Sequence, residues 1–131
     1  MSGTLVVIPT FNERENINPL MKSIFSQKID VDVLILDDNS PDGTKKVVLE
    51  NKKKYINRLH LINRGKKQGL GKAYIEGFKW ALKKEYKKVI QMDADLSHPP
   101  EKLVDIVNEL DSYDFVIGSR YVNGIRVLNW P

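Results

Sequence analysis

The chain has 131 residues and a formal net charge of +4; hydrophobic residues make up 41% of it and charged residues 29%. This length suits one domain with its own core, and the composition is ordinary for a soluble globular protein. With no cysteine and only two histidines, the sequence excludes a disulfide scaffold and a thiolate metal site and disfavours a His-rich zinc site.

The positive charge comes mainly from lysines, which cluster at residues 52–54 and between 83 and 88. Because the charge excess is modest and the lysines are spread over surface segments, solvated helix faces are favoured over nucleic-acid binding. Attraction to an anionic membrane surface is a further alternative. The sequence shows no signal-peptide pattern and no apolar run near the ~20 residues that cross a bilayer, so we expect a cytoplasmic location.

Short apolar runs rich in β-branched residues predict the strands. They are nearly continuous rather than alternating, which is typical of strands buried on both faces of a parallel sheet. In chain order the predicted strands are Thr4–Pro9, Val31–Asp37, Arg58–Ile62, Lys88–Asp93 and Asp114–Ser119.

Amphipathic stretches between these runs predict helices. In the first, Asn12 and Glu15 resemble a capping pair, and the second is expected to open at Ser40-Pro41. A third helix is predicted from Leu70 to Ala81, and a fourth after Pro99-Pro100. The apolar stripe of the first helix, at helical spacing, consists of Ile17, Leu20, Met21, Ile24 and Phe25.

This alternation of strands and helices predicts one α/β domain with a mainly parallel sheet and right-handed crossovers. Residues 120–131 show no clear pattern, yet they include Tyr121, Val127, Leu128 and Trp130. Such a tail is expected to bury against something. We therefore expect the chain to be the front portion of a longer protein, or to need a partner there.

Polar residues collect after each predicted strand, where open α/β sheets bind their ligands. These segments are residues 9–13, 37–44, 63–72, 93–95 and 118–121. The sequence therefore predicts one crevice with several carboxylates, a glycine loop and an arginine.

Asp93 and Asp95 are the most informative pair. At the end of a strand, residues i and i+2 point to the same side, so both carboxylates can converge on one hard cation. Mg²⁺ or Mn²⁺ held in this way completes its shell with substrate phosphates. The alternative is an ordinary solvated turn.

Gly69 and Gly71 match neither common nucleotide fingerprint. A Walker loop would need glycine at Lys66 and Ser or Thr at Ala73, and a dinucleotide loop would need glycine at Tyr74. Two compatible interpretations remain. The glycines permit a tight turn and close packing of the third helix, or they line a nucleotide pocket.

Asp37 and Asp38 are adjacent, so in an extended chain their carboxylates point apart. We expect one to be structural and Asp38 to accept a hydrogen bond from a nucleobase or ribose. Arg120, at the end of the last predicted strand, is expected to face phosphates, the alternative being an ordinary surface arginine.

In this order the motifs resemble family 2 glycosyltransferases of the GT-A fold, and within them the dolichol-phosphate (polyprenol-phosphate) mannosyltransferase branch. The matching segments are Ile8–Asn16, Asp37–Thr44, Gly69–Tyr74, Met92–Glu101 and Gly118–Val122. The branch assignment depends mainly on Ser40–Thr44 and on Ser97–Glu101.

The resemblance implies a GT-A nucleotide-diphospho-sugar transferase fold, Rossmann-like, with Mg²⁺ or Mn²⁺ as cofactor. It implies metal binding by Asp93 and Asp95, with Ser97, where many relatives have glutamine, acting through water. It gives Asp95 and Arg120 the catalytic roles. The donor-binding residues that it implies are Pro9, Phe11, Glu13, Leu36, Asp38, Asp93, Ala94, Asp95 and Arg120.

The implied reaction moves a hexose, most simply mannose from GDP-mannose, to a polyprenyl or dolichyl phosphate with inversion at the anomeric carbon. The enzyme would act at the cytoplasmic face of a membrane without nucleic acid, and residues 1–131 would be the N-terminal, nucleotide-sugar-binding portion of its catalytic domain. Two alternatives remain open: another donor or acceptor, such as UDP-glucose, and a non-catalytic nucleotide-sugar-binding fragment.

Overall fold

The computed structural model describes residues 3–27, 29–65, 69–94, 120–122 and 125–129, the last two ranges by their backbone. Strands and helices alternate in the first part of the chain. The elements are β1 (Thr4–Thr10), α1 (Arg14–Phe25), β2 (Asp32–Asp37), α2 (Thr44–Lys54), β3 (Leu59–Asn63), α3 (Leu70–Lys83), β4 (Lys88–Met92), β5 (Arg120–Val122) and β6 (Ile125–Asn129).

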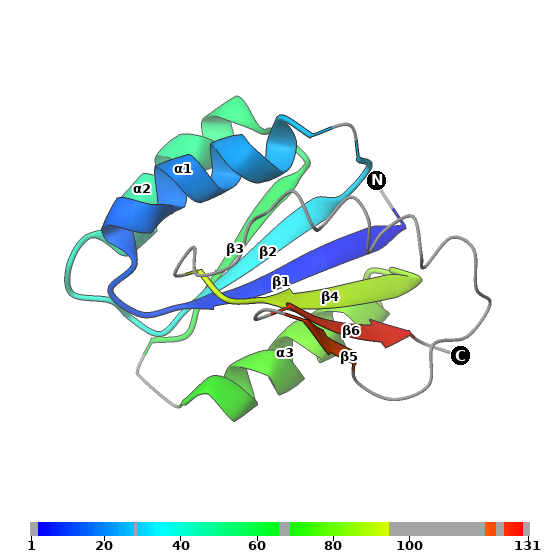
Figure 1. Cartoon of the computed structure of the whole chain (residues 1–131). Helices are drawn as coiled ribbons and strands as arrows, with labels where there is room; N and C mark the ends of the chain where they lie inside the picture. Colours follow the sequence, from blue (N-terminus) through cyan, green and yellow to red (C-terminus); the bar gives the residue numbers. More distant parts are fainter. Residues whose placement is uncertain (1–2, 28, 66–68, 95–119, 123–124, 130–131) are drawn as a thin grey trace.

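The strands form one sheet in the order β3-β2-β1-β4-β6-β5. Strands β1 to β4 are parallel to one another, whereas β6 runs antiparallel to both β4 and β5. Helices α1 and α2 cover one face of the sheet and α3 covers the other (Figure 1). The predicted mainly parallel α/β architecture is confirmed.

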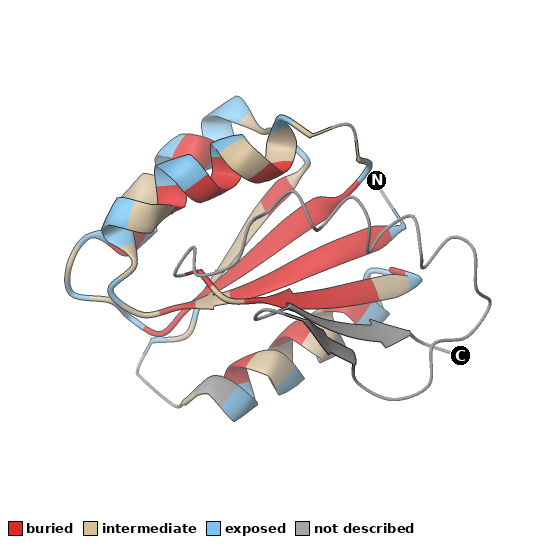
Figure 2. Cartoon of the chain, in the orientation of Figure 1, coloured by how far each residue is buried: buried red, intermediate tan, exposed pale blue. Residues whose placement is uncertain are grey.

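The central strands are buried on both faces, as their continuous apolar runs predict (Figure 2). In β1, Val6 and Ile8 belong to the core cluster under α1 and α2, while Leu5 and Val7 belong to the cluster under α3. Successive strand residues point to opposite faces, so one run supplies both clusters. Each fully buried aliphatic side chain contributes about 1.5–3 kcal/mol.

Helix α1 buries the predicted stripe, but its predicted cap is wrong. Asn12 has a left-handed backbone (φ 56°), and Glu13 occupies the cap position without a side-chain capping bond. The N–H groups at the start of α1 instead donate to side chains that precede or open α2. Glu13 N–H donates to Thr44 Oγ1 (3.1 Å), and Arg14 N–H donates to Asp42 Oδ2 (3.2 Å). Adjacent parallel strands bring these two loops together, which local spacing does not reveal.

Helix α2 starts at Thr44, later than the predicted Ser40-Pro41. Gly43 has a φ of 92° and interrupts any helix before it. The Asp42 carboxylate accepts the Thr44 N–H (3.0 Å), so residues 40–43 form a turn held by side chains.

Helix α3 agrees with its predicted span, but its close approach to the sheet occurs at Gly77. A Cβ built on Gly77 would lie 2.7 Å from Val7 Cγ1 and 3.2 Å from Leu36 Cδ1. Among the described residues, neither Gly69 nor Gly71 has such a neighbour within 4 Å, so the close helix packing predicted at these two glycines is wrong for that part of the chain. The tight turn predicted with it is confirmed at Gly69, whose φ is 95°.

The C-terminal tail, for which no pattern was predicted, contains β5 and β6. Strand β6 pairs with β4 in a register that sets Val127 opposite Ile90. Its apolar run is too short to identify alone, and the pairing with an adjacent strand decides its structure. The strand predicted at 114–119 and the helix predicted after Pro99-Pro100 lie outside the described residues.

Candidate functional site

The loops that follow β1 and β2 are joined by the Asp37 carboxylate. It is fully buried and accepts hydrogen bonds from Thr10 Oγ1 (2.8 Å), Ser40 Oγ (2.6 Å) and Ser40 N–H (2.9 Å). The Ser40 hydroxyl in turn accepts the Asn12 N–H (2.9 Å). Of the adjacent pair Asp37 and Asp38, Asp37 thus has the structural role that was expected for one of them.

Asp38 lies just beyond β2 and is 7% exposed. Its N–H donates to Thr10 O (3.0 Å), which fixes the main chain next to the end of β1. Its Oδ1 accepts a bond from Arg64 Nη1 (2.7 Å), and its Oδ2 accepts the Gly69 N–H (3.3 Å). The carboxylate is thereby held between the ends of β1, β2 and β3.

Arg64 also lies at this edge of the sheet, and the sequence alone predicts no role for it. Its side chain is 2% exposed and lies between two carboxylates, with Nη1 2.7 Å from Asp38 Oδ1 and Nε 2.9 Å from Glu76 Oε2. The only signal in the sequence was an arginine directly after a buried strand, since Glu76 reaches it from α3.

A second group of bonds holds the start of α1. The Asp42 carboxylate accepts bonds from Arg14 N–H, Thr44 N–H and the Thr44 hydroxyl. Burial acts to raise the pKa of Asp42, but these hydrogen bonds together outweigh it, and the pKa lies below its usual value.

The other predicted donor-binding residues that precede Asp38 lie in β1, directly after β1, or in β2. Pro9 lies in β1 opposite Leu36, and Phe11 follows β1; both are half-buried. Glu13 accepts a bond from Asn16 Nδ2 (2.7 Å). The Leu36 side chain is fully buried in the cluster under α3, so a ligand would reach its main chain only.

On the other side of β1, Asp93 follows β4 and is half-buried. Its Oδ1 accepts a long bond from the Tyr74 hydroxyl (3.3 Å), and Ala94 beside it is 4% exposed. Helix α3 thus contacts Asp38 through Gly69 and Asp93 through Tyr74. Asp95 and Ser97 lie outside the described residues.

Arg120 is the first residue of β5, and its backbone is placed by strand pairing. It lies opposite Val127 of β6, which lies opposite Ile90 of β4. At ~4.8 Å per strand, its main chain is roughly 10 Å from β4.

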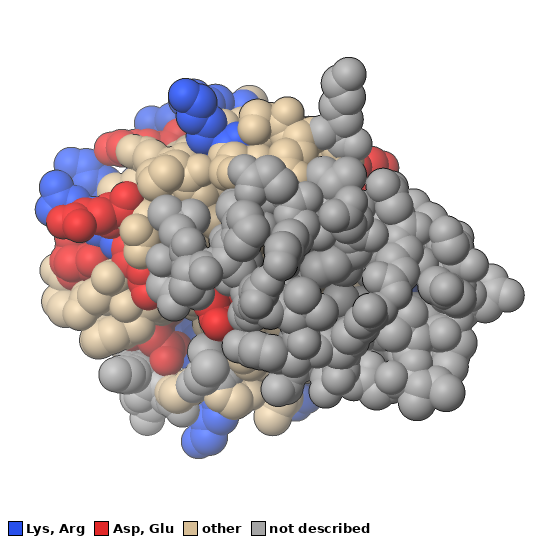
Figure 3. Space-filling model, in the orientation of Figure 1, with Lys and Arg blue, Asp and Glu red and all other residues tan. Residues whose placement is uncertain are grey.

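Acidic groups gather where β1 and β2 run into α1 and α2 (Figures 1 and 3). Among the described residues no three His, Cys, Asp or Glu side chains form a ready metal cluster. Carboxylates at this edge suit two tasks: accepting hydrogen bonds from N–H and hydroxyl groups, and binding a hard cation that carries phosphates.

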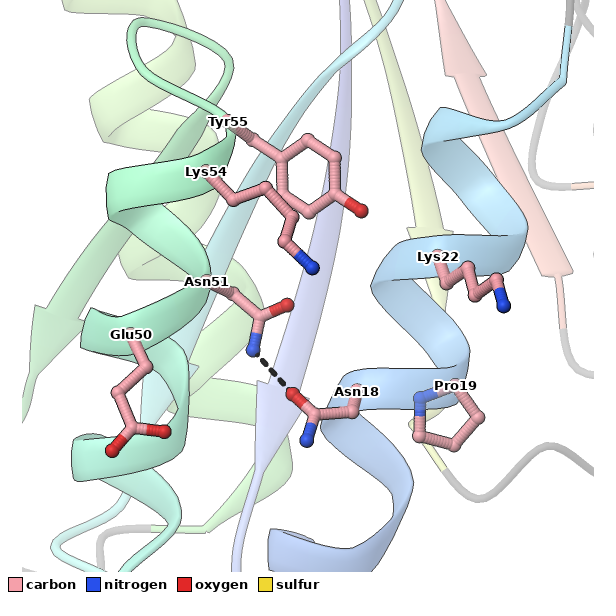
Figure 4. Close-up of a pocket in the computed structure, with 7 residues that line it drawn as sticks. All are labelled: Asn18, Pro19, Lys22, Glu50, Asn51, Lys54 and Tyr55. Atoms are coloured by element: carbon pink, nitrogen blue, oxygen red, sulfur yellow. Dashed lines mark hydrogen bonds between the residues drawn. The ribbon is translucent and has the colours of Figure 1, made fainter.

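A groove of about 490 Å³ lies elsewhere, between α1 and α2 (Figure 4). Asn51 Nδ2 donates to Asn18 Oδ1 across it (2.6 Å). None of its lining residues is a predicted site residue; they are Asn18, Pro19, Lys22, Glu50, Asn51, Lys54 and Tyr55.

Comparison with solved structures supports the fold. A mannosyltransferase from Pyrobaculum calidifontis, solved in complex with GDP-Man and Mn²⁺, superposes with a TM-score of 0.81 at 20% identity, covering 98% of this chain and 44% of that one. The architecture is therefore that of GT-A proteins, as predicted.

The sequence model described as "Glycosyl transferase family 2" matches residues 5–131, so the chain belongs to this family. It is 44% identical over 129 residues to a polyprenol monophosphomannose synthase of Mycolicibacterium smegmatis, covering 98% of this chain and 49% of the relative. It is 40% identical over 127 residues to an undecaprenyl-phosphate mannosyltransferase of Micrococcus luteus, covering 97% and 52%. The chain thus spans about half the length of these curated relatives.

One structural feature bears on membrane attachment. No helix in the described ranges has the length and apolar character needed to cross a bilayer.

Proposed function

We propose that this chain is the nucleotide-sugar-binding portion of a glycosyltransferase that moves mannose from GDP-mannose to a polyprenyl phosphate. The observation that carries this proposal is the position of Asp38 and Asp93. They follow β2 and β4, the two neighbours of β1, at the carboxyl edge of the sheet. Two of the similar proteins are named for mannosyl transfer to a polyprenyl phosphate, which supports the proposed acceptor. A third is a structure with GDP-Man bound, which supports the proposed donor.

The residues at this edge fit a divalent cation. Asp93 offers a half-buried carboxylate oxygen after β4, and Mg²⁺ or Mn²⁺ needs only one or two protein carboxylates when substrate phosphates complete its shell. Asp93 and Asp95 would hold the ion, with Ser97 reaching it through water. When bound, the cation supplies positive charge beside the leaving diphosphate.

The protein's own groups then bind and orient the substrates. The Asp38 carboxylate accepts hydrogen bonds from the nucleoside, with Pro9, Phe11 and Glu13 around it, and Arg120 stabilises charge on the phosphates. The attacking phosphate monoester has a second pKa near 6, so it arrives mostly deprotonated. A protein general base is therefore not required, and in-line attack inverts the anomeric carbon.

The test is calorimetric titration of the chain with GDP, UDP and GDP-mannose, with and without Mn²⁺, together with mannose transfer to a polyprenyl phosphate. We expect Mn²⁺-dependent binding of GDP tighter than that of UDP, and Asp95→Ala should remove the Mn²⁺ dependence. Tighter binding of UDP would favour another donor. Binding of GDP-mannose without any transfer would favour a non-catalytic binding fragment.

We also propose that the protein acts peripherally at the cytoplasmic face of a membrane, where a polyprenyl phosphate resides. Helix α3 supports this, because its outer surface combines apolar and basic side chains. Ile75 and Leu82 are 55% and 54% exposed, and the lysines at 72, 79 and 83 are exposed beside them. This composition is typical of a surface that contacts anionic lipid.

A further inference from the structure

We propose that Arg64 is a positioning residue for nucleotide recognition: it fixes the Asp38 carboxylate in the orientation that binds the nucleoside of the donor. This inference deepens the proposed function and depends on it, because the role of Asp38 is part of that proposal.

The geometry of Arg64 shows that it connects three elements. Its N–H donates to Asp37 O (2.9 Å), which continues the alignment of β3 beside β2. Its Nη1 donates both to Asp38 Oδ1 (2.7 Å) and to Gly69 O (3.2 Å), and its Nε lies 2.9 Å from Glu76 Oε2. One planar group therefore joins the end of β2, the start of α3 and the loop between β3 and α3.

The Gly69 amide completes the arrangement from the other side. It donates to Asp38 Oδ2 (3.3 Å) from a backbone with φ 95° and ψ 160°, a region that essentially only glycine adopts. Oδ1 of Asp38 thus accepts a bond from Arg64 and Oδ2 a bond from Gly69. Because these two bonds engage both oxygens, together they fix the plane of the carboxylate.

An arginine is needed at this position because its donors form a rigid fork. Lysine has the same charge on a flexible stem, and its compact ammonium cannot match several acceptors of fixed position. The Arg64 side chain is only 2% exposed, so water has little access to replace a lost contact. Arg64→Lys would keep the positive charge while releasing the Asp38 carboxylate and the Gly69 carbonyl from a common anchor.

The main test compares Arg64→Lys with two matched variants by calorimetric titration of GDP in the presence of Mn²⁺. We expect Arg64→Lys to weaken GDP binding about tenfold, the loss of one charge-assisted contact. Glu76→Gln, which alters only the outer, half-exposed partner, should weaken binding less than about threefold.

Arg58→Lys serves as the control for folding. Arg58 donates to Val31 O (3.1 Å) and lies over the Phe25 ring (4.6 Å), so it too is a partly buried structural arginine. Neither of these partners is a predicted site residue. Arg58→Lys should lower the melting temperature and leave GDP binding unchanged.

A purely structural role for Arg64 makes a different prediction. In that case Arg64→Lys would lower the melting temperature as Arg58→Lys does, without a change in GDP affinity, and the inference would be wrong. In a transfer assay the expected signature is a raised KM for GDP-mannose with kcat within about twofold. A fall in kcat with KM unchanged would also overturn it.

The proposed function and the role of Arg64 can be disproved separately. If the wild-type chain binds no guanine nucleotide, the proposed function fails and this inference fails with it. If the wild-type chain binds GDP and Arg64→Lys binds it equally well, only the role of Arg64 is disproved.

Discussion

At the scale of single residues, Asp42 shows how one carboxylate holds two helix starts. It lies in the turn before α2, yet one of its bonds goes to the Arg14 amide at the first position of α1. Helix starts leave several amides without partners in the helix, and a side-chain acceptor there contributes about 0.5–2 kcal/mol. The Asp42 carboxylate therefore couples the loop after β1 to the loop after β2.

This coupling predicts a dependence of stability on pH. Hydrogen bonds keep the pKa of Asp42 below its usual value, so the ionised form favours the folded state. The stabilisation is present above the unfolded pKa near 4 and is lost as pH falls through the lower, folded pKa. Asp42→Asn should be less stable than the wild type by about 0.5–1 kcal/mol at pH 7, measured by urea unfolding.

The same comparison at pH 3 checks the sign. The difference between wild type and Asp42→Asn should shrink there, because the wild-type carboxyl is then becoming protonated. Glu50→Gln, at an exposed position of α2, is the control and should change stability by less than about 0.5 kcal/mol at both pH values. A difference that grows towards pH 3 would contradict the assignment.

At the scale of elements, the packing of α3 depends on Gly77. The space for a Cβ is taken by Val7 Cγ1 at 2.7 Å, so the helix lies closer to β1 than any larger residue allows. Gly69, at the start of α3, donates to Asp38, and Tyr74 of α3 donates to Asp93. The distance of α3 from the sheet therefore sets where these two donors lie.

Gly77→Ala is therefore expected to destabilise the protein by about 1–3 kcal/mol, although alanine is the better helix former by about 1 kcal/mol. Gly71→Ala in the same helix meets no atom of the residues that the structure describes within 4 Å and should be neutral or stabilising. Thermal or urea unfolding measures both. In a double-mutant cycle, the variant that combines Val7→Ala with Gly77→Ala should lose less stability than the sum of the two single losses. If Gly77→Ala were more stable than the wild type, this description of the packing would be wrong.

The same elements show what the sequence could predict. The strands β1 to β4 and the stripe of α1 were predictable because buried strands and amphipathic helices have strong periodic signals. The cap of α1, the start of α2 and the pairing of β6 were not, since each depends on a partner distant in sequence. Arg64 was missed for the same reason: its role arises from Asp38 and Glu76, which only the folded chain brings to it.

At the scale of the whole molecule, the two faces of the sheet differ in what they offer a membrane. Helices α1 and α2 lie on one face and α3 on the other (Figure 1), so the exposed lysines of α2 and those of α3 belong to opposite sides of the sheet. Helix α3 is preceded by Gly69 at its N-cap position, which contacts Asp38. Contact of α3 with lipid would therefore bring the carboxyl edge of the sheet near the headgroups, where the proposed acceptor, a polyprenyl phosphate, would present its nucleophile.

Changing Lys79 and Lys83 together to glutamine should accordingly weaken binding to vesicles that contain phosphatidylglycerol. A lysine near an anionic surface contributes about 1 kcal/mol, so losing two should reduce partitioning by about tenfold or more. Cosedimentation measures this, and the binding should fall with added salt. The matched control changes Lys52 and Lys53, exposed in the last turn of α2, and should leave binding nearly unchanged. Equal losses from the two double variants would mean that net charge governs attachment rather than the α3 surface.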